Sequence, residues 1–324
     1  MAGWLERRWY RPQASNGWLR PLAALYGVVA RRRRRLYQQG VKSSWRAPVP
    51  LIVVGNISVG GTGKTPLTQA LCGWLRQQGW RPGIVSRGYG GHSAHYPLAV
   101  TAQTAAAACG DEPLLLAQST GCPVVVDPQR SRAAQFLLSH YDCDLIISDD
   151  GLQHYALARD IEIAVVDGER GLGNRALLPA GPLRESPQRL DEVDLVVVNG
   201  GAWAFPGAHR MVLQPGVPRG LDDQPAALAP GRVHALAGIG NPQRFFDTLA
   251  TLGFDPEPHP LPDHHAICEA ELQFGDDLPL IMTAKDAVKC RAFDPYNRYY
   301  LPVNAELPPA FYRALQRLLQ PFRD

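Results

Sequence analysis

The sequence predicts an α/β fold in which a doubly wound, mostly parallel sheet precedes a second, smaller α/β domain. Two observations support this fold: short β-branched runs alternate with helix-like stretches, and each run ends in glycine or polar residues. A basic, aromatic segment stands in front of both domains. With 324 residues, 45% of them apolar and 19% charged, the chain is long enough for about two domains and is not disordered.

The first segment, residues 1–46, holds eleven basic residues and one acidic residue, a net charge of +10. Since the whole chain carries +3, the remainder carries −7. The apolar run at 21–30 is too short to cross a bilayer, and five arginines follow it where a signal peptide would be cleaved. Interleaved aromatic and basic residues favour a helix lying in a membrane surface, but nucleic acid and a solvated face packed on the body remain alternatives.

The second segment, residues 47–201, carries the alternation of the large domain. The expected strands end in polar residues and occur at 50–56, 81–88, 144–151, 161–168 and 194–201. Helix-like stretches occupy 66–78 and 131–140. Because parallel strands place their carboxyl ends at one edge, the polar residues should meet at a ligand site there.

A linker is expected at 202–232, where prolines and glycines interrupt the pattern. The smaller α/β domain then spans 233–324, with apolar runs at 233–240 and 278–286. We expect a ligand cleft between the two domains. Six cysteines without a C-x-x-C pair or a Cys/His cluster indicate a reduced, cytosolic protein.

A P-loop follows the first expected strand of the large domain. Glycine amides converge on phosphate oxygens, lysine reaches the β and γ phosphates, and threonine ligates Mg²⁺. Serine stands where the usual pattern has its first glycine. The predicted nucleotide-binding residues are Ser58, Gly60, Gly61, Thr62, Gly63, Lys64 and Thr65.

Acidic residues complete the predicted phosphate site. Asp149 and Asp150 end the strand at 144–151 and could hold Mg²⁺, although a helix cap is the alternative. Asp111 and Glu112 precede a helix and, taken alone, favour a cap. His264 follows Asp263 and could be a general base, a metal ligand or a surface histidine.

Across nearly its whole length the chain resembles the tetraacyldisaccharide 4'-kinases of lipid A biosynthesis. The matching segments, in family order, are WRAPVPLIVVGNISVGGTGKTP, SRGYGG, GDEPLLLA, DDGLQHYALARDIEI, LPAGPLRE, AGIGNPQRFF, PDHH and MTAKDAVKCRAF. The family's loop accommodates the serine at 58, and its members carry a basic, aromatic helix that associates with the membrane.

The resemblance implies transfer of the ATP γ-phosphoryl group, with Mg²⁺, to the 4'-hydroxyl of an acylated glucosamine disaccharide 1-phosphate. It also implies a peripheral protein at the cytoplasmic face of the bacterial inner membrane, held to anionic lipid by residues 1–46. We expect a monomer that binds no nucleic acid.

The resemblance further implies roles for individual residues. Asp111 matches a catalytic aspartate paired with the histidine of a D-H motif, here His264. Lys64 and Asp150 belong to the catalytic set, and Thr65, Asp149 and Asp150 to the magnesium site. Glu112 accompanies Asp111 near the nucleotide, and Arg130, in preference to Arg132, matches an arginine near the phosphates.

A P-loop GTPase or metallochaperone is the alternative from another functional class. Such proteins select guanine with an Asn/Thr-Lys-x-Asp element, which the segment at 282–286 only half resembles, because its lysine and aspartate are adjacent.

Overall fold

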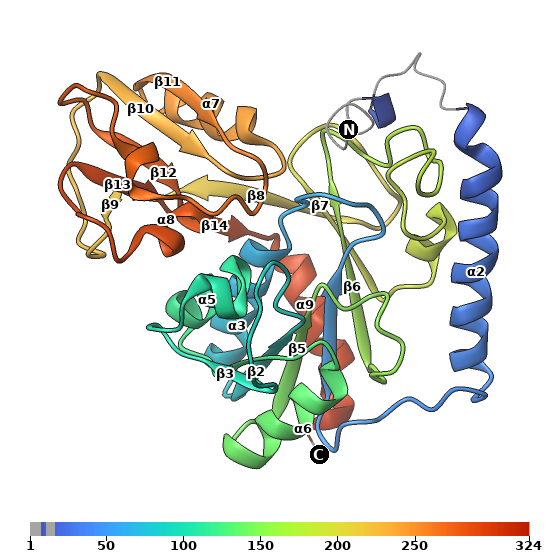
Figure 1. Cartoon of the computed structure of the whole chain (residues 1–324). Coiled ribbons are helices and arrows are strands. Elements are labelled where there is room, and N and C mark those ends of the chain that lie inside the picture. The colour runs from blue at the N-terminus through green and yellow to red at the C-terminus, as the bar shows by residue number, and fades with distance from the viewer. Residues whose placement is uncertain (1–7, 11–16, 324) are drawn as a thin grey trace.

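The computed structural model describes residues 8–10 and 17–323, which form two sheets of different size with a long helix at one side (Figure 1). We refer to the two parts built on these sheets as the large body and the small body. The strands are β1 (Leu51–Gly55), β2 (Pro82–Ser86), β3 (Leu98–Val100), β4 (Val124–Val126), β5 (Leu145–Asp149), β6 (Ile161–Asp167), β7 (Leu195–Asn199), β8 (His209–Pro215), β9 (Arg219–Gly220), β10 (Arg232–Ala237), β11 (Asp255–Pro260), β12 (Leu280–Thr283), β13 (Arg298–Leu301) and β14 (Val303–Glu306).

The helices connect these strands and cover them. The α-helices are α2 (Arg20–Gln38), α3 (Lys64–Gln77), α4 (Ala106–Cys109), α5 (Asp111–Thr120), α6 (Arg130–His140), α7 (Pro242–Thr251), α8 (Ala284–Cys290) and α9 (Pro309–Leu319). Short 3-10 helices are η1 (Gly17–Leu19), η2 (Pro187–Asp191), η3 (Glu269–Leu272) and η4 (Gln320–Phe322).

The large sheet has the strand order β14-β8-β7-β6-β1-β5-β2-β4-β3. Only its two edge strands are antiparallel to their neighbours; the other pairs are parallel. After β1 the chain first builds toward β3 and then returns to build β6, β7 and β8 on the other side. The predicted doubly wound, mostly parallel fold is therefore confirmed, and β1 lies where the winding direction changes, the usual position of a ligand site.

Both faces of the large sheet are covered, which explains the continuous apolar runs of its strands. One face packs against side chains of α3, α5 and α9, including Leu71, Leu114 and Phe311. The other packs against α6 and the segment after β6, including Leu137 and Leu190. All five residues of β1 are buried.

The small sheet has the order β11-β10-β12-β13-β9, with β9 antiparallel to β13 and the other pairs parallel. Helix α7 packs on one face through Phe245, Phe246 and Leu249. Helix α8 and η3 cover the other face. This body therefore has its own two-sided core.

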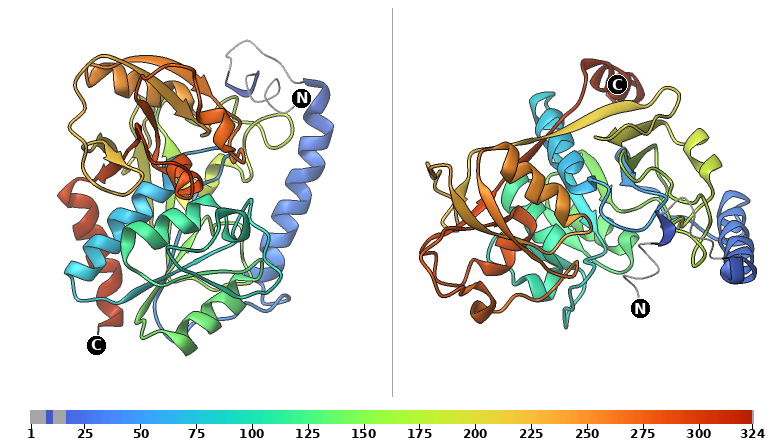
Figure 2. Two further views of the ribbon diagram at one scale, coloured as in Figure 1. Left: turned by 60° about the vertical axis from the view of Figure 1, so that its left-hand side comes forward. Right: turned by 90° about the horizontal axis from the view of Figure 1, so that it is seen from above.

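Helix α2 lies along the large body on the side away from the small sheet (Figures 1 and 2). It packs through the small residues Ala23 and Gly27, and a Cβ on Gly27 would lie 2.6 Å from Leu177 Cδ1. The Tyr26 hydroxyl donates to the Arg184 carbonyl at 3.1 Å. Among the described residues, no helix is long and apolar enough to span a membrane.

The sheet pairing departs from the expected segmentation at two places. Strand β8 lies inside the expected linker at 202–232, because its half-buried alternation extends the large sheet beyond β7 and its prolines fall at or outside the strand end. Strand β14 and α9 lie inside the expected small domain, yet they join the large body.

The small body is thus inserted between β8 and β14 of the large sheet. Its two connecting segments lie side by side, with the Gly216 amide donating to the Pro302 carbonyl at 2.8 Å.

Candidate active site

A cleft of about 1020 Å³ lies between the two bodies. The P-loop and α3 line one side of it, with Gly61, Thr62, Gly63, Lys64 and Thr65. The small body lines the other side with residues that include Gly240, Asp263 and Lys285. The cleft that the sequence predicts between two α/β units is present, and it is large enough for a ligand of nucleotide size.

The conformation of the P-loop is fixed by hydrogen bonds from the side chains of Asn56 and Asn199. Asn56 Nδ2 donates to the Gly60 carbonyl and to Thr62 Oγ1, both at 3.3 Å. Asn199 Nδ2, at the end of β7, donates to the Thr62 carbonyl at 3.1 Å. Gly63 has φ 96°, and a Cβ there would lie 2.4 Å from Asn199 Nδ2, so only glycine fits this turn.

Lys64 begins α3 and meets Asp150 across the carboxyl edge of the sheet, with Nζ 3.5 Å from Oδ1. Arg184 approaches the same carboxylate at 3.2 Å. Burial alone would raise the pKa of Asp150, but the positive charges of Lys64, Arg184 and Arg130 hold that pKa well below its usual range. Asp150 is therefore ionised throughout the physiological pH range.

Asp149 ends β5 and is fully buried beneath the P-loop helix. Its Oδ1 accepts from Thr68 Oγ1 at 3.3 Å, and its Oδ2 has no hydrogen-bond partner. Burial and the negative charge of Glu112 raise the pKa of Asp149 to about 7, although Lys64 opposes the shift. An orphaned carboxylate oxygen next to Thr68, which lies three residues along α3 from Thr65, fits the oxygen-donor environment that Mg²⁺ requires, directly or through water.

Asp111 and His264 form a pair that joins the two bodies. Asp111 begins α5, and His264 lies in the loop after β11; its Nδ1 is 3.0 and 3.1 Å from the two carboxylate oxygens. Burial would raise the pKa of Asp111, but the His264 hydrogen bond and the charge of Lys285 lower it. The hydrogen bond to Asp111 raises the pKa of His264 despite partial burial.

Lys285, at the start of α8, gathers acidic residues from both bodies. Its Nζ lies 2.9 Å from Asp263 Oδ1, 3.1 Å from Glu112 Oε1 and 3.8 Å from Asp111 Oδ2. Burial opposes the ammonium form, but these carboxylates raise the pKa of Lys285. The arrangement places a permanent positive charge in the cleft wall, beside the pair of Asp111 and His264.

The cluster around the P-loop and the cluster around Asp111 each contain a residue with a strained backbone conformation. Asp150 has φ 48° and His264 has φ 61°, in the left-handed region that side chains rarely adopt. Such conformations cost free energy and are concentrated at functional sites.

Three predicted nucleotide-binding residues, Ser58, Gly60 and Arg130, are not part of the cleft lining. Ser58 is buried in a bridge to Leu183. The buried Arg130 donates to the carbonyls of Asp149 and Asp150, at 3.1 and 2.7 Å. Arg132 pairs with Asp127 at 2.5 Å. Arg130 therefore stabilises the turn that carries Asp149 and Asp150 through the carbonyl groups of that turn.

Sequence reasoning missed two residues that contact the predicted site. Arg184 lies in a loop 34 positions from Asp150, and the segment LPAGPLRE that contains it offers no chemical pattern of its own. Asn199 ends a strand, and that position at the ligand edge was the one signal that could have identified it.

Comparisons with known proteins identify the family to which the chain belongs. The profile of the family described as tetraacyldisaccharide-1-P 4'-kinase matches residues 16–320. The tetraacyldisaccharide 4'-kinase of Alkalilimnicola ehrlichii is 53% identical, covering 98% of this chain and 96% of the relative. That of Azotobacter vinelandii is 50% identical, with 98% of each chain covered.

Among solved structures, the Aquifex aeolicus LpxK in complex with ATP superimposes with a TM-score of 0.79 at 28% identity. The match covers 93% of this chain and 98% of that one. The similarity therefore includes both bodies as well as the P-loop.

Proposed function

Because the chain belongs to the tetraacyldisaccharide 4'-kinase family, it transfers the γ-phosphoryl group of ATP to the 4'-hydroxyl of tetraacyldisaccharide 1-phosphate in lipid A biosynthesis, and we propose how its residues do so. The observation that carries the proposal is that the pair of Asp111 and His264 adjoins Glu112 and Lys285, which line the same cleft as the P-loop.

The P-loop holds the triphosphate. Amides of 60–63 face the phosphate oxygens, and Lys64 neutralises the β and γ phosphates. Thr65, Asp149 and Asp150 would hold Mg²⁺, which when bound would offset negative charge on the phosphates. The orphaned Oδ2 of Asp149 supports this role. Arg184 keeps Asp150 in place, and Arg130 fixes the turn beneath both acids.

Asp111 accepts the proton of the 4'-hydroxyl. Its lowered pKa keeps it ionised and ready to accept, and His264 orients the carboxylate through Nδ1. Glu112 anchors Lys285 next to this position. Since phosphoryl transfer depends on positioning and charge neutralisation, these groups supply what the reaction demands of the protein.

Turnover with labelled ATP, Mg²⁺ and the tetraacyl acceptor tests these roles, with label followed into lipid. Asp111→Asn and His264→Ala should each lower kcat by about 10² to 10⁴, the usual contribution of a general base. ATP affinity should persist in both variants and be lost in Lys64→Ala. Asp255→Asn, a carboxylate change on β11 outside the site, is the control. Equal loss of ATP binding in the Asp111 and His264 variants would contradict the proposed division of roles.

Helix α2 supports a second part of the proposal, peripheral binding to an anionic membrane through residues 1–46. It packs on the body through small residues and leaves the larger apolar side chains of Leu22, Leu25, Val28 and Val29 exposed. Trp18, in the preceding η1, is exposed as well. Arg31, Arg32, Arg33 and Arg35 are exposed on the following turns. An apolar face followed by cationic heads suits the interface where an acylated substrate resides. Residues 1–7 and 11–16 also belong to the predicted membrane-binding segment, but they lie outside the described residues.

Sedimentation with vesicles containing anionic lipid tests this binding. The triple variant Leu22→Ser, Leu25→Ser, Val29→Ser should lose most of its bound fraction while remaining folded, because these side chains already face solvent. Tyr296→Ser changes an equally exposed apolar residue on the small body. If the triple variant sediments like the wild type, α2 is not the anchor.

We also propose that the protein acts as a monomer at the cytoplasmic face of the inner membrane, without nucleic acid. The GTPase alternative gains no support, because Lys285 of the half-matching segment is engaged by Glu112 and Asp263.

A further inference from the structure

We propose that His234, Glu257 and His259 form a binding site for a divalent transition-metal ion, with Zn²⁺ the best match. These residues are the group of possible metal ligands found in the described part of the chain, and their ligand atoms all lie within 4.8 Å of one another. The site belongs to the small body and shares no residue with the cleft. The bound ion would stabilise the sheet and would not take part in catalysis.

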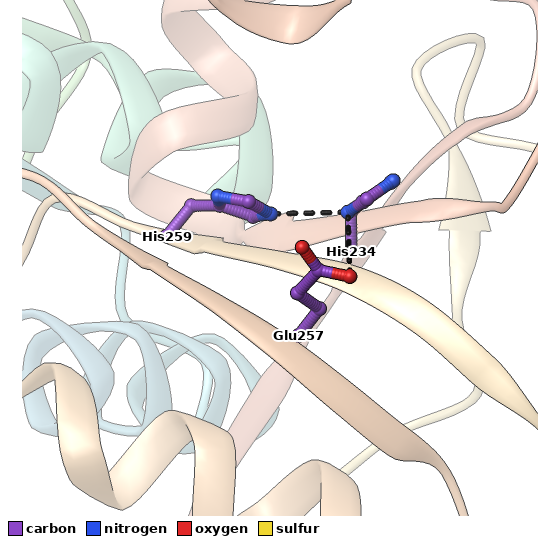
Figure 3. A group of neighbouring side chains, drawn as sticks. All are labelled: His234, Glu257 and His259. Carbon is purple, nitrogen blue, oxygen red and sulfur yellow. Dashed lines mark hydrogen bonds and ion pairs between the residues drawn. The ribbon is translucent and has the colours of Figure 1, made fainter. Parts of the chain in front are cut away.

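Strand pairing brings the three ligands to one face of the sheet. Strands β10 and β11 run parallel, with His234 opposite Glu257 and Leu236 opposite His259. Since side chains alternate along a strand, residues 257 and 259 point to the same side as their partners. Figure 3 shows the two imidazoles facing each other with the Glu257 carboxylate beside them. His234 Nδ1 lies 3.0 Å from His259 Nε2 and 4.0 Å from Glu257 Oε2.

The neighbouring Asp276 fixes which nitrogen of His234 is available. His234 Nε2 lies 3.0 Å from Asp276 Oδ1. A carboxylate only accepts, so Nε2 carries the proton and a neutral His234 presents its Nδ1 lone pair toward His259 and Glu257. A carboxylate on the far nitrogen of a histidine is the usual support of a metal ligand, because it sets the ring's tautomer and orientation.

The ligands are held in position before any ion binds. Phe274 stacks on both imidazoles, with ring centroids at 4.0 Å from His234 and 4.2 Å from His259. His234 is 3% exposed. The edge strand β11 alternates Pro256, Pro258 and Pro260 with the residues that face the site. The Asp255 amide donates to the Gly231 carbonyl just before β10, and the Leu261 amide donates to the Ala237 carbonyl at the end of β10. The intervening prolines, which lack an N–H, therefore occupy the outward positions of the edge.

The donor set selects the class of ion. Two imidazole nitrogens and one carboxylate, with a position left for water, match Zn²⁺ and its first-row neighbours. Mg²⁺ prefers an all-oxygen octahedral environment and would not compete effectively for the two nitrogens. Zinc bonds of about 2.0 to 2.2 Å require only small side-chain shifts, because the ligand atoms already lie within 4.8 Å of one another.

The position of the site indicates its effect. His234 lies near the start of β10, whereas residues that follow the end of this strand, Ile239 and Gly240, line the cleft. Strand β11 is an edge strand of the small sheet and pairs only with β10, and His264 follows it closely in the chain. An ion would join β10 to this edge, and binding to the native state alone raises its stability in proportion to ligand saturation.

Calorimetric titration of the metal-free full chain with Zn²⁺, in excess Mg²⁺ to occupy oxygen sites, tests the proposal. His259→Gln and Glu257→Gln each remove one ligand, and both side chains are accessible enough for the fold to tolerate the change. His140→Gln removes a histidine on α6 and controls for weak binding to surface imidazoles. Asp276→Asn tests the support of His234. Absorption of bound Co²⁺ reports the ligand geometry.

We expect one site in the wild type and in His140→Gln, accompanied by a higher thermal midpoint with Zn²⁺. Affinity should fall about 100-fold or more in His259→Gln and Glu257→Gln, and about 10- to 100-fold in Asp276→Asn. Absence of saturable Zn²⁺ binding in the wild type would overturn the proposal. So would equal affinity in all variants, which would place the ion elsewhere, for example at His264 or Cys268.

Discussion

Asp111 keeps its negative charge in a buried position because positive or hydrogen-donating groups face it from the small body. His264 donates to both carboxylate oxygens, and the amines of Lys285 and Lys289 lie 3.8 and 4.0 Å from Oδ2. The proton acceptor therefore belongs to the large body, whereas the groups that lower its pKa belong to the small body. Two predictions test this dependence.

The first prediction concerns the charge on His264. In Asp111→Asn the carboxylate that raises the pKa of His264 is gone, while Lys285 still disfavours the imidazolium. The His264 pKa should therefore fall from above 6.5 to that value or lower, and the imidazolium should be lost at lower pH than in the wild type. NMR titration of the imidazole measures this, with His140 as an internal reference. An unchanged His264 pKa would show that the hydrogen bond is not formed in solution.

The second prediction concerns Lys285. Its charge lowers the pKa of Asp111, so Lys285→Met should raise that pKa and move the acid limb of kcat/KM to higher pH. Lys285→Arg keeps the charge and should leave the limb near its wild-type position. A uniform loss of rate across the pH range in Lys285→Met would instead assign the lysine to binding alone.

The site residues that can be predicted from the sequence are those that belong to a continuous local motif. Lys64 and Thr65 follow a strand within one glycine loop, and Asp149 ends a neighbouring strand, so each is visible locally. Arg184 and the support of Lys285 by Glu112 and Asp263 depend on contacts between distant segments, which no local pattern encodes.

Elements predicted from alternation are present where their apolar residues face a single core. Strands β1, β5, β6 and β7 fall within the expected runs, because a strand buried on both faces reads as continuously apolar. Strand β14 and helix α9 were expected in the small domain, since they follow its strands in the chain. The sequence of an amphipathic helix indicates which of its faces is buried, but it does not indicate which of two cores that face covers.

The third prediction tests where α9 belongs. Phe311 is fully buried among large-body residues, so Phe311→Ala should lower the free energy of unfolding by about 3 to 5 kcal/mol. Gln316→Ala, on the exposed face of the same helix, should change it by less than about 0.5 kcal/mol. Denaturant unfolding followed by hydrogen exchange in α3 and in α7 separates the bodies. Loss of protection in α7 alone would place the helix with the small body.

On the scale of the whole molecule, charge is divided between residues 1–46, which include α2, and the rest of the chain. Residues 1–46 carry +10 on a remainder of −7, and α2 lies on the side away from the small body. In the membrane-bound state that we propose, the small body therefore lies on the side away from the lipid. The composition predicted this division, but only the structure shows which apolar side chains are left exposed.

The fourth prediction follows from that division. Binding to anionic vesicles should weaken as salt rises from about 0.1 to 1 M, because the screening length falls from about 10 to 3 Å. Replacing Arg31, Arg32 and Arg33 by Gln should remove most of this salt dependence, whereas the apolar triple variant should weaken binding at every salt concentration. Salt-independent binding by the wild type would contradict an electrostatic contribution.

The paired connections at Gly216 and Pro302 restrict how the small body can move. Two adjacent connections of this kind can act as a hinge about which the small body turns relative to the large body. Opening by a few degrees would part Asp111 from His264 and Glu112 from Lys285 simultaneously. Release of product and loss of the groups that orient and tune Asp111 would then be one mechanical event, which leaves the open form with a proton acceptor that His264 no longer orients.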